Sequence, residues 1–265
     1  MTQDERRRYL INAFLKERRE DGTEIPNGRE AQRRLLRGLM NVRPPRETDS
    51  RVLRVQDAYL QAEIQKKGVT EAAELPQLEP GISLWKGDIT TLRCDAIVNA
   101  ANSGMTGCYA PNHRCIDNCI HTFSGVQLRL RCAELMEAQG HGEPTGQAKI
   151  TPAYNLPCRC VLHTVGPIIS GRPTARDAEL LASCYRSCLA LAAENGLESV
   201  AFCCISTGEF HYPNREAAEI AVREVRSFLA RGSSVSQVIF NVFKDADEQI
   251  YRELLCPDGA AAHGV

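Results

Sequence analysis

Residues 99–121 read NAANSGMTGCYAPNHRCIDNCIH, a segment that holds a Cys-x4-His-x-Cys cluster. The preceding residues 94–98, CDAIV, form a short apolar run suited to a buried strand. From Cys115 onward the apolar residues follow helical spacing. A loop that joins the carboxyl end of a strand to the start of a helix is where open α/β sheets bind ligands. The cluster is therefore placed where a metal ion can act on a bound substrate.

The chain after Gly81 alternates between strand and helix patterns. Strands are expected at 82–85, 96–99, 147–151, 159–164, 199–205 and 237–242. Helices are expected at 115–138, 177–195, 213–231 and 246–255. This alternation predicts a layered α/β domain with a mostly parallel central sheet. Between 146 and 167 two strands follow each other without a helix, so we expect a mixed sheet with an antiparallel part.

The front of the chain is helical in pattern. Helices are expected at 4–20, 29–40 and 50–67. Each apolar face is too small to be stable alone, so these helices should dock on the remainder of the chain. We therefore divide the chain into a helical extension, 1–75, and a second domain, 76–265, and expect the small-residue tail 259–265 to be loose.

The composition excludes some classes of function. The chain has 265 residues and a net charge of −1, with both signs interspersed. Balanced charge argues against a dominant electrostatic grip on nucleic acid or an anionic membrane. No apolar run approaches the length of a bilayer span, and residues 1–20 are charged throughout, which is unlike a secretory signal. A cytoplasmic location is therefore expected. Thiols stay reduced in that compartment, so most of the twelve cysteines should be small buried apolar residues and not disulfides.

The cysteine and histidine cluster has the residue types that zinc prefers. Cys108, His113 and Cys115 supply three such ligands within eight residues. Cys115 lies at a helix start, where the helix dipole favours thiolate. Spacing alone leaves three alternatives: an open three-ligand site, a closed Cys3His site that adds Cys119, or no metal.

A second loop has the character of a phosphate site. Residues 206–210, STGEF, follow an apolar strand and precede a helix. Such loops can present several backbone N–H groups to a phosphate, although STG is also common in ordinary turns. The pairs 103–104 and 106–107 can form the opposing wall.

Four short motifs in one order carry a family resemblance. They are GDIT at 87–90, NAAN at 99–102, HTVGP at 163–167 and ISTG at 205–208. Together they resemble a macrodomain. The Cys-x4-His-x-Cys residues and the long N-terminal segment make the chain similar to the zinc-containing macrodomains. Those proteins are similar to bacterial and fungal protein-ADP-ribose hydrolases. The resemblance implies a three-layer α/β/α macrodomain with a mixed sheet, preceded by the helical extension.

The resemblance also implies roles for the central loop. One Zn²⁺ per chain would be held by Cys108, His113 and Cys115, with one position open. Asn102 and Asp117 match positions that approach the ribose next to the scissile bond. Asp117 is then a general base or a ribose-orienting group, and a cap on the helix amino terminus is compatible with either role.

Three further residues are interpreted by the same resemblance. Asn99 would brace the loop, and His121 would pack or form a hydrogen bond. Phe243 would contact the adenine face or lie in the core.

The nucleotide would be bound by two loops. Asp88 matches the family aspartate that accepts a hydrogen bond from the adenine amino group, and the Ile89 N–H would donate to the adenine ring. The alternative is that Asp88 is only a capping residue at the end of a strand. The diphosphate loop comprises Ser206, Thr207, Gly208, Glu209 and Phe210. The family pattern has a small residue where this chain has Glu209, and a glycine where it has His211. A carboxylate would repel a bound diphosphate, so the Glu209 side chain is expected to face solvent.

The implied reaction is attack of water on the bond between ADP-ribose and a protein acceptor. An ester to Asp or Glu fits best, because zinc can polarise its carbonyl. The alternatives are a non-catalytic ADP-ribose reader with a structural zinc, a nucleic-acid or poly(ADP-ribose) binder, and an O-acetyl-ADP-ribose deacetylase. The family often accompanies a sirtuin-type ADP-ribosyltransferase and a lipoylated carrier protein.

Overall fold

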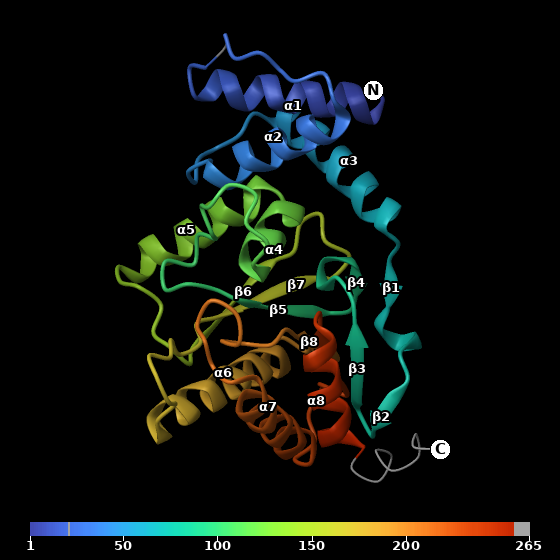
Figure 1. Ribbon diagram of the computed structural model, residues 1–265, viewed down its shortest axis with the longest axis vertical. Helices are drawn as coiled ribbons and strands as arrows, with labels where there is room; N and C mark the ends of the chain where they lie inside the picture. Colours follow the sequence, from blue (N-terminus) through green and yellow to red (C-terminus); the bar gives the residue numbers. More distant parts are fainter. Residues whose placement is uncertain (21, 257–265) are drawn as a thin grey trace.

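A mixed seven-stranded sheet lies between two layers of helices (Figure 1). The structure is a computed structural model that describes residues 1–20 and 22–256, so the predicted loose tail at 259–265 lies outside it. The strands, in their spatial order, are β2 (Gln77–Glu79), β3 (Ile82–Lys86), β9 (Gln237–Val242), β8 (Ser199–Phe202), β5 (Ala96–Ala100), β7 (Cys160–Thr164) and β6 (Ala148–Pro152).

The two edge strands run against the others. β2 is antiparallel to β3 and β6 is antiparallel to β7, whereas the five inner strands are parallel. The mixed sheet expected from the sequence is therefore confirmed, including its antiparallel part between 146 and 167. The inner strands are mostly buried and rich in apolar residues, as expected where helices cover both faces of the sheet.

Helices lie on both sides of the sheet in the described part of the chain. The face towards the N-terminal helices carries α4 (Ile116–Ser124) and α5 (Val126–Gln139) (Figure 1). The opposite face carries α6 (Ala175–Glu194), α7 (Asn214–Leu229) and α8 (Asp245–Leu255). The expected three-layer architecture is confirmed.

The single helix expected at 115–138 is wrong, because Gly125 divides it into α4 and α5. Gly125 has φ 103°, a left-handed conformation that ends a helix. A Cβ at this position would lie 2.7 Å from Nε2 of Gln56. The Gln56 side chain also accepts a 3.0 Å hydrogen bond from the Val126 N–H. A residue of a distant helix thus fixes the break.

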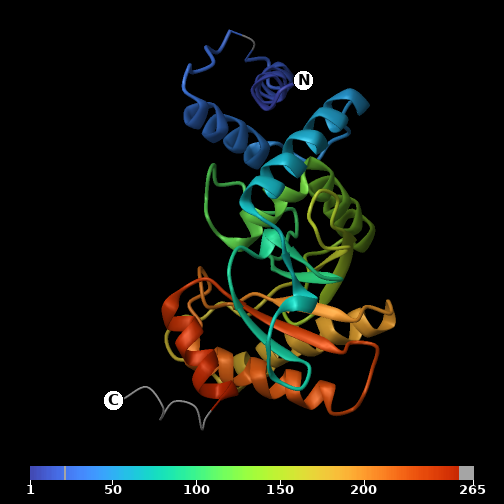
Figure 2. The same cartoon turned by 90° about the vertical axis from the view of Figure 1, so that its right-hand side faces the viewer.

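The N-terminal helices stack on the α4 and α5 layer in both views (Figures 1 and 2). They are α1 (Gln3–Glu17), α2 (Arg29–Val42) and α3 (Ser50–Lys67). They enclose an apolar core of their own, to which Val126 of α5 also belongs. Docking on the remainder of the chain is therefore confirmed, while the division at residue 75 stays a prediction.

Several short elements have no counterpart in the sequence patterns. They are the paired strands β1 (Thr70–Glu71) and β4 (Leu92–Arg93), the 3-10 helices η1 (Ala72–Glu74) and η2 (Ile89–Thr91), and the edge strand β2. Two or three residues are too few to show a period. Across 1–20 and 22–256, the helices are all too short or too polar to cross a bilayer.

Candidate active site

The predicted site residues come from three loops at one edge of the sheet. These loops follow β3, β5 and β8, which run parallel, so their carboxyl ends meet at the same edge. Asp88, Asn102 and Ser206 each lie in one of these loops. The topology therefore brings the predicted adenine, ribose and diphosphate residues to a common edge.

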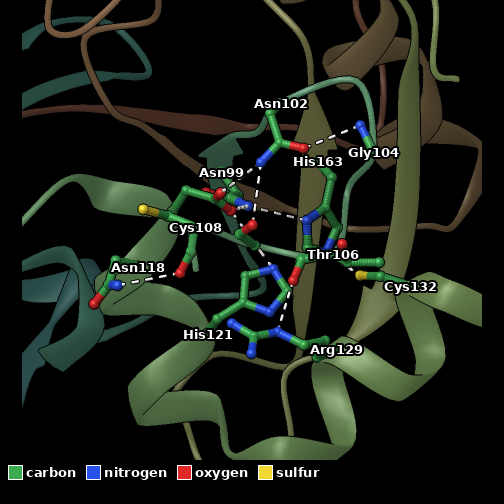
Figure 3. A network of polar contacts seen from close by, with 12 residues as sticks. Asn99, Asn102, Gly104, Thr106, Cys108, Asn118, His121, Arg129, Cys132 and His163 are labelled. Atoms are coloured by element: carbon green, nitrogen blue, oxygen red, sulfur yellow. Dashed lines mark hydrogen bonds and ion pairs between the residues drawn. The ribbon is translucent and has the colours of Figure 1, made fainter. Parts of the chain in front are cut away.

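A polar network ties Asp117 of α4 to Asn99 of β5. Figure 3 shows Asn99, Asn102 and His163 of this network. The buried Asn99 side chain donates from Nδ2 to Oδ1 of Asp117 at 2.8 Å and to Nδ1 of His163 at 3.1 Å. Asn102 donates from Nδ2 to Oδ2 of Asp117 at 3.3 Å and to the Gly107 carbonyl at 3.2 Å. Asn99 and Asn102 thus hold the two carboxylate oxygens of Asp117 from the loop side.

The buried Asp117 carboxylate has an unusual environment for an acid. It is 5% exposed, and burial raises its pKa to about 6 although the Asn99 hydrogen bond acts in the opposite direction. The expected helix cap at Asp117 is wrong: the α4 cap is Cys115, whose sulfur accepts from the Asn118 N–H, and Asp117 lies in the first turn of the helix. Asp117 is therefore held inside the site.

Two buried histidines lie beside Asp117. His121 has Nε2 3.5 Å from Oδ1 of Asp117, and burial lowers the pKa of His121 well below its usual value. Neither ring nitrogen of His121 has a hydrogen-bond partner among the described residues. His163, from the HTVGP motif, has both nitrogens engaged, since Thr151 Oγ1 lies 2.9 Å from Nε2. Burial lowers the pKa of His163 to about 3, so both rings are neutral.

The predicted metal ligands are gathered in the structure. The ligand atoms of Cys108, His113 and Cys115 all lie within 4.8 Å of one another. Sγ of Cys108 is 3.5 Å from Nδ1 of His113. A tetrahedral zinc would place a bound sulfur and nitrogen roughly 3.6 Å apart, so the donor set and spacing fit this ion. Cys119 lies outside the cluster, with its sulfur 3.4 Å from Nη2 of Arg37.

Burial works against a thiolate at Cys115. It raises the pKa of this thiol to about 12, and the hydrogen bond from the Asn118 backbone only partly offsets it. The effect of the helix start on this thiol opposes that of burial and stays a prediction. A thiolate at this position needs a cation beside it.

The loop after β8 is tightly packed at its start. Ser206 is buried in a left-handed conformation with φ 65°, and its Oγ has no partner among the described residues. A Cβ on Gly166 would lie only 2.0 Å from this oxygen. Further along, Thr207 Oγ1 donates to the Cys204 carbonyl, and the Phe210 carbonyl accepts from the Ile169 N–H.

Gly208 and Glu209, in the middle of the β8 loop, are both exposed. Around Gly208 no atom lies within 4 Å of an added Cβ, so that part of the loop is open. The Glu209 side chain is 70% exposed, as expected from the sequence, but its Oε1 also lies 3.5 Å from Nε2 of His113. The loops after β5 and β8 therefore touch, a contact that the sequence did not indicate.

The predicted adenine residues lie beside α3. Asp88 caps η2 by accepting from the Thr90 N–H, and its other oxygen accepts from Nζ of Lys67 at 2.8 Å. The capping alternative thus describes the structure, Ile89 is buried, and adenine recognition stays a prediction for both residues. Phe243 is 79% exposed, so the core alternative for this ring is wrong.

The comparisons with known proteins agree with this architecture. The family described as Macro domain matches residues 98–221. A protein-ADP-ribose hydrolase of Treponema medium is 58% identical over 260 residues, which cover 96% of this chain and 100% of that protein. One of Staphylococcus aureus strain MSSA476 is 50% identical over 248 residues, covering 92% of this chain and 93% of its own.

A solved structure extends the likeness to the fold. The Trypanosoma brucei macrodomain in complex with ADP-ribose has a TM-score of 0.64 and 30% identity, and covers 79% of this chain and 92% of that chain. The two hydrolases match this chain over 96% and 92% of its length at 58% and 50% identity. The chain therefore belongs to the macrodomain family.

Proposed function

We propose that this chain is a zinc-dependent hydrolase that removes mono-ADP-ribose, ester-linked to Asp or Glu, from modified proteins and releases ADP-ribose. The names of its relatives support ADP-ribose removal. One observation carries the zinc-dependent part: the β5–α4 segment supplies both the buried carboxylate Asp117 and the gathered set Cys108, His113 and Cys115. A zinc ion held by the three ligands and the Asp117 carboxylate would then act on the same bound substrate.

The chain's own residues would prepare the ribose and the water. Asn99 and Asn102 fix the orientation of the Asp117 carboxylate through their amide groups. Asp117 would orient the ribose hydroxyls or accept the proton of the attacking water. Cys108, His113 and Cys115 would hold the zinc ion. When bound, zinc supplies a Lewis acid that polarises the ester carbonyl or the ribose oxygens.

The remaining loops would hold the nucleotide. The diphosphate would lie against backbone N–H groups of residues 206–210, which begin beside Gly166. Asp88 and the Ile89 N–H would bind adenine, with Lys67 occupying the second oxygen of Asp88. The exposed Phe243 ring would cover the adenine face.

The experiment pairs metal analysis with release of ADP-ribose from a carboxylate-modified protein. Wild type should hold one zinc per chain and release ADP-ribose, and Cys108→Ala should lose both. Cys119→Ala should keep both, because its sulfur lies outside the cluster. Cys160→Ala, at the start of β7, is the matched control for loss of a partly exposed cysteine.

Three outcomes would contradict the proposal in different ways. Zinc lost with hydrolysis retained makes the metal structural. Zinc retained with no release from any modified protein identifies a reader. Release from O-acetyl-ADP-ribose alone identifies a deacetylase that uses the same pocket. The functional link to a sirtuin-type transferase and a lipoylated carrier stays a prediction.

A further inference from the structure

Helix α2 of the N-terminal extension contacts the metal-binding loop directly. Nη2 of Arg37 donates to the His113 carbonyl at 2.8 Å and to Oδ1 of Asn118 at 3.0 Å. Asn118 in turn donates from Nδ2 to the Cys108 carbonyl at 3.3 Å. One guanidinium is therefore joined to the backbone of two of the three predicted ligands, once directly and once through the fully buried Asn118.

A second contact holds the turn between these ligands. Asn112 has φ 58°, a left-handed conformation that asparagine tolerates better than most residues. Its backbone N–H donates to Oδ1 of Asn41 at 2.9 Å, and the Asn41 side chain donates onward to Oγ1 of Thr122 in α4 at 2.9 Å. Asn41 is 1% exposed. It therefore links the turn to the helix that begins at Cys115.

The carboxyl end of α2 is itself fixed to the start of the same loop. Arg129 of α5 is buried and donates from Nη1 to the carbonyls of Asn41 and Arg43. Its Nε donates to the Thr106 carbonyl at 2.7 Å (Figure 3). The guanidinium also lies 4.2 Å from the ring centroid of Tyr109, the residue after Cys108. Loop and helix end thus share one cationic partner.

We propose that α2 is a brace of the metal-binding loop, and that Arg37 and Asn41 are positioning residues that set His113 and Cys108 relative to Cys115. This inference rests on the proposed zinc site and deepens it. A metal site needs its ligands pre-placed, and loss of an outer partner commonly costs 10- to 100-fold in metal affinity. Here the outer partners come from the N-terminal extension.

The first arm of the test measures release of zinc from the full-length protein to a chromogenic chelator. Arg37→Met keeps an unbranched apolar stem and removes the guanidinium with its donors. It should release zinc about 10- to 100-fold faster than wild type. Arg34→Met is the matched control, because the Arg34 side chain is exposed on the same helix and forms no ion pair with the described residues. A wild-type release rate for Arg37→Met would overturn the proposal.

The second arm needs no metal. Hydrogen exchange of the metal-free protein should show faster exchange at residues 108–114 in Arg37→Met and Asn41→Ala, with β9 unchanged. A merely structural role would instead raise exchange in β9 as well or lower the melting temperature without selective exposure of the loop, and either result contradicts positioning. If Arg37→Met does not fold, Arg37→Lys replaces it, because the lysine side chain is one atom shorter and its nitrogen falls short of the position from which Nη2 donates to both acceptors.

The two proposals fail in distinguishable ways. Wild-type protein without zinc would contradict the proposed function, while the exchange arm still decides whether α2 braces the loop. Wild-type protein with zinc that Arg37→Met and Asn41→Ala hold equally well would contradict the brace alone. Zinc release that is faster in Arg37→Met and Asn41→Ala but not in Arg34→Met supports both.

Discussion

Oε1 of Glu209 lies 3.5 Å from Nε2 of His113, while Nδ1 of the same ring faces Sγ of Cys108. The loop after β8 therefore contacts the outer side of a predicted zinc ligand. A carboxylate on the second nitrogen of a metal-bound histidine fixes the tautomer and the ring orientation. Glu209, which departs from the family pattern, is in this position.

The first prediction concerns the strength of that contact. Both side chains are well exposed, at 38% for His113 and 70% for Glu209, and exposed ion pairs contribute about 1 kcal/mol or less. Glu209→Gln should therefore speed zinc release by less than about fivefold. Chelator competition measures this, with Glu216→Gln on α7 as control. An effect as large as that of Arg37→Met would mean that Glu209 is a main support of His113.

The second prediction separates chemistry from binding. Asp117→Asn should lower the rate of ADP-ribose release about 100-fold or more, since the amide can neither accept a proton nor bind hydroxyls as a carboxylate does. Affinity for free ADP-ribose, measured by calorimetry, should persist because the adenine and diphosphate loops are untouched. Asp245→Asn, at an exposed position in α8, is the control. Equal activity of Asp117→Asn and wild type would remove Asp117 from the reaction.

The third prediction uses the buried His163. Its folded-state pKa, about 3, lies below its ordinary value of 6.5, so the unfolded chain binds a proton that the folded chain does not. Stability is therefore present above pH 6.5 and is lost as pH falls towards the folded pKa. Between pH 7.5 and pH 5, His163 should account for about 2 kcal/mol of lost unfolding free energy.

Urea unfolding of the metal-free protein at the two pH values measures this loss. His163→Asn should show a pH dependence that is smaller by that amount, whereas His141→Asn, which removes an exposed histidine, should behave as wild type does. An unchanged pH dependence in His163→Asn would show that His163 is not buried as a neutral ring.

The fourth prediction tests the close approach of two loops. Gly166→Ala would place a Cβ 2.0 Å from Oγ of Ser206 and 2.8 Å from Cγ2 of Ile205, so the β8 loop must shift. The affinity for ADP-ribose should fall about tenfold, in line with the cost of overpacking. Calorimetry measures it. Gly28→Ala is the control, because its Cβ meets nothing closer than 3.9 Å. Unchanged affinity in Gly166→Ala would argue against a diphosphate site at Ser206.

The regular elements were predictable where one period runs through consecutive residues. The patterns at 50–67 and 237–242 give α3 and β9 with their observed bounds. The break at Gly125 was missed because a single glycine is tolerated inside a helical pattern, and the contact that fixes it comes from Gln56, in another helix. Local periodicity does not contain that information.

The site divides in the same way. Cys108, His113 and Cys115 are close in sequence, so their clustering follows from spacing, and the structure gathers them. Arg37 and Asn41 contact that loop from more than 70 residues upstream, and no local pattern marks them. Partners that are distant in sequence become visible only once the fold joins α2 to α4.

Helix α4 determines how the candidate catalytic groups and the β8 loop can move relative to each other. Cys115 caps it, Asp117 lies in its first turn and His121 lies one turn further. The backbone of this one short helix therefore fixes the spacing between a sulfur, a carboxylate and an imidazole. A tilt of α4 about Gly125 would move these three side chains together relative to the β8 loop. Substitutions in the residues that pack under α4 would therefore change the position of the candidate catalytic groups without altering the loop that is proposed to bind the nucleotide.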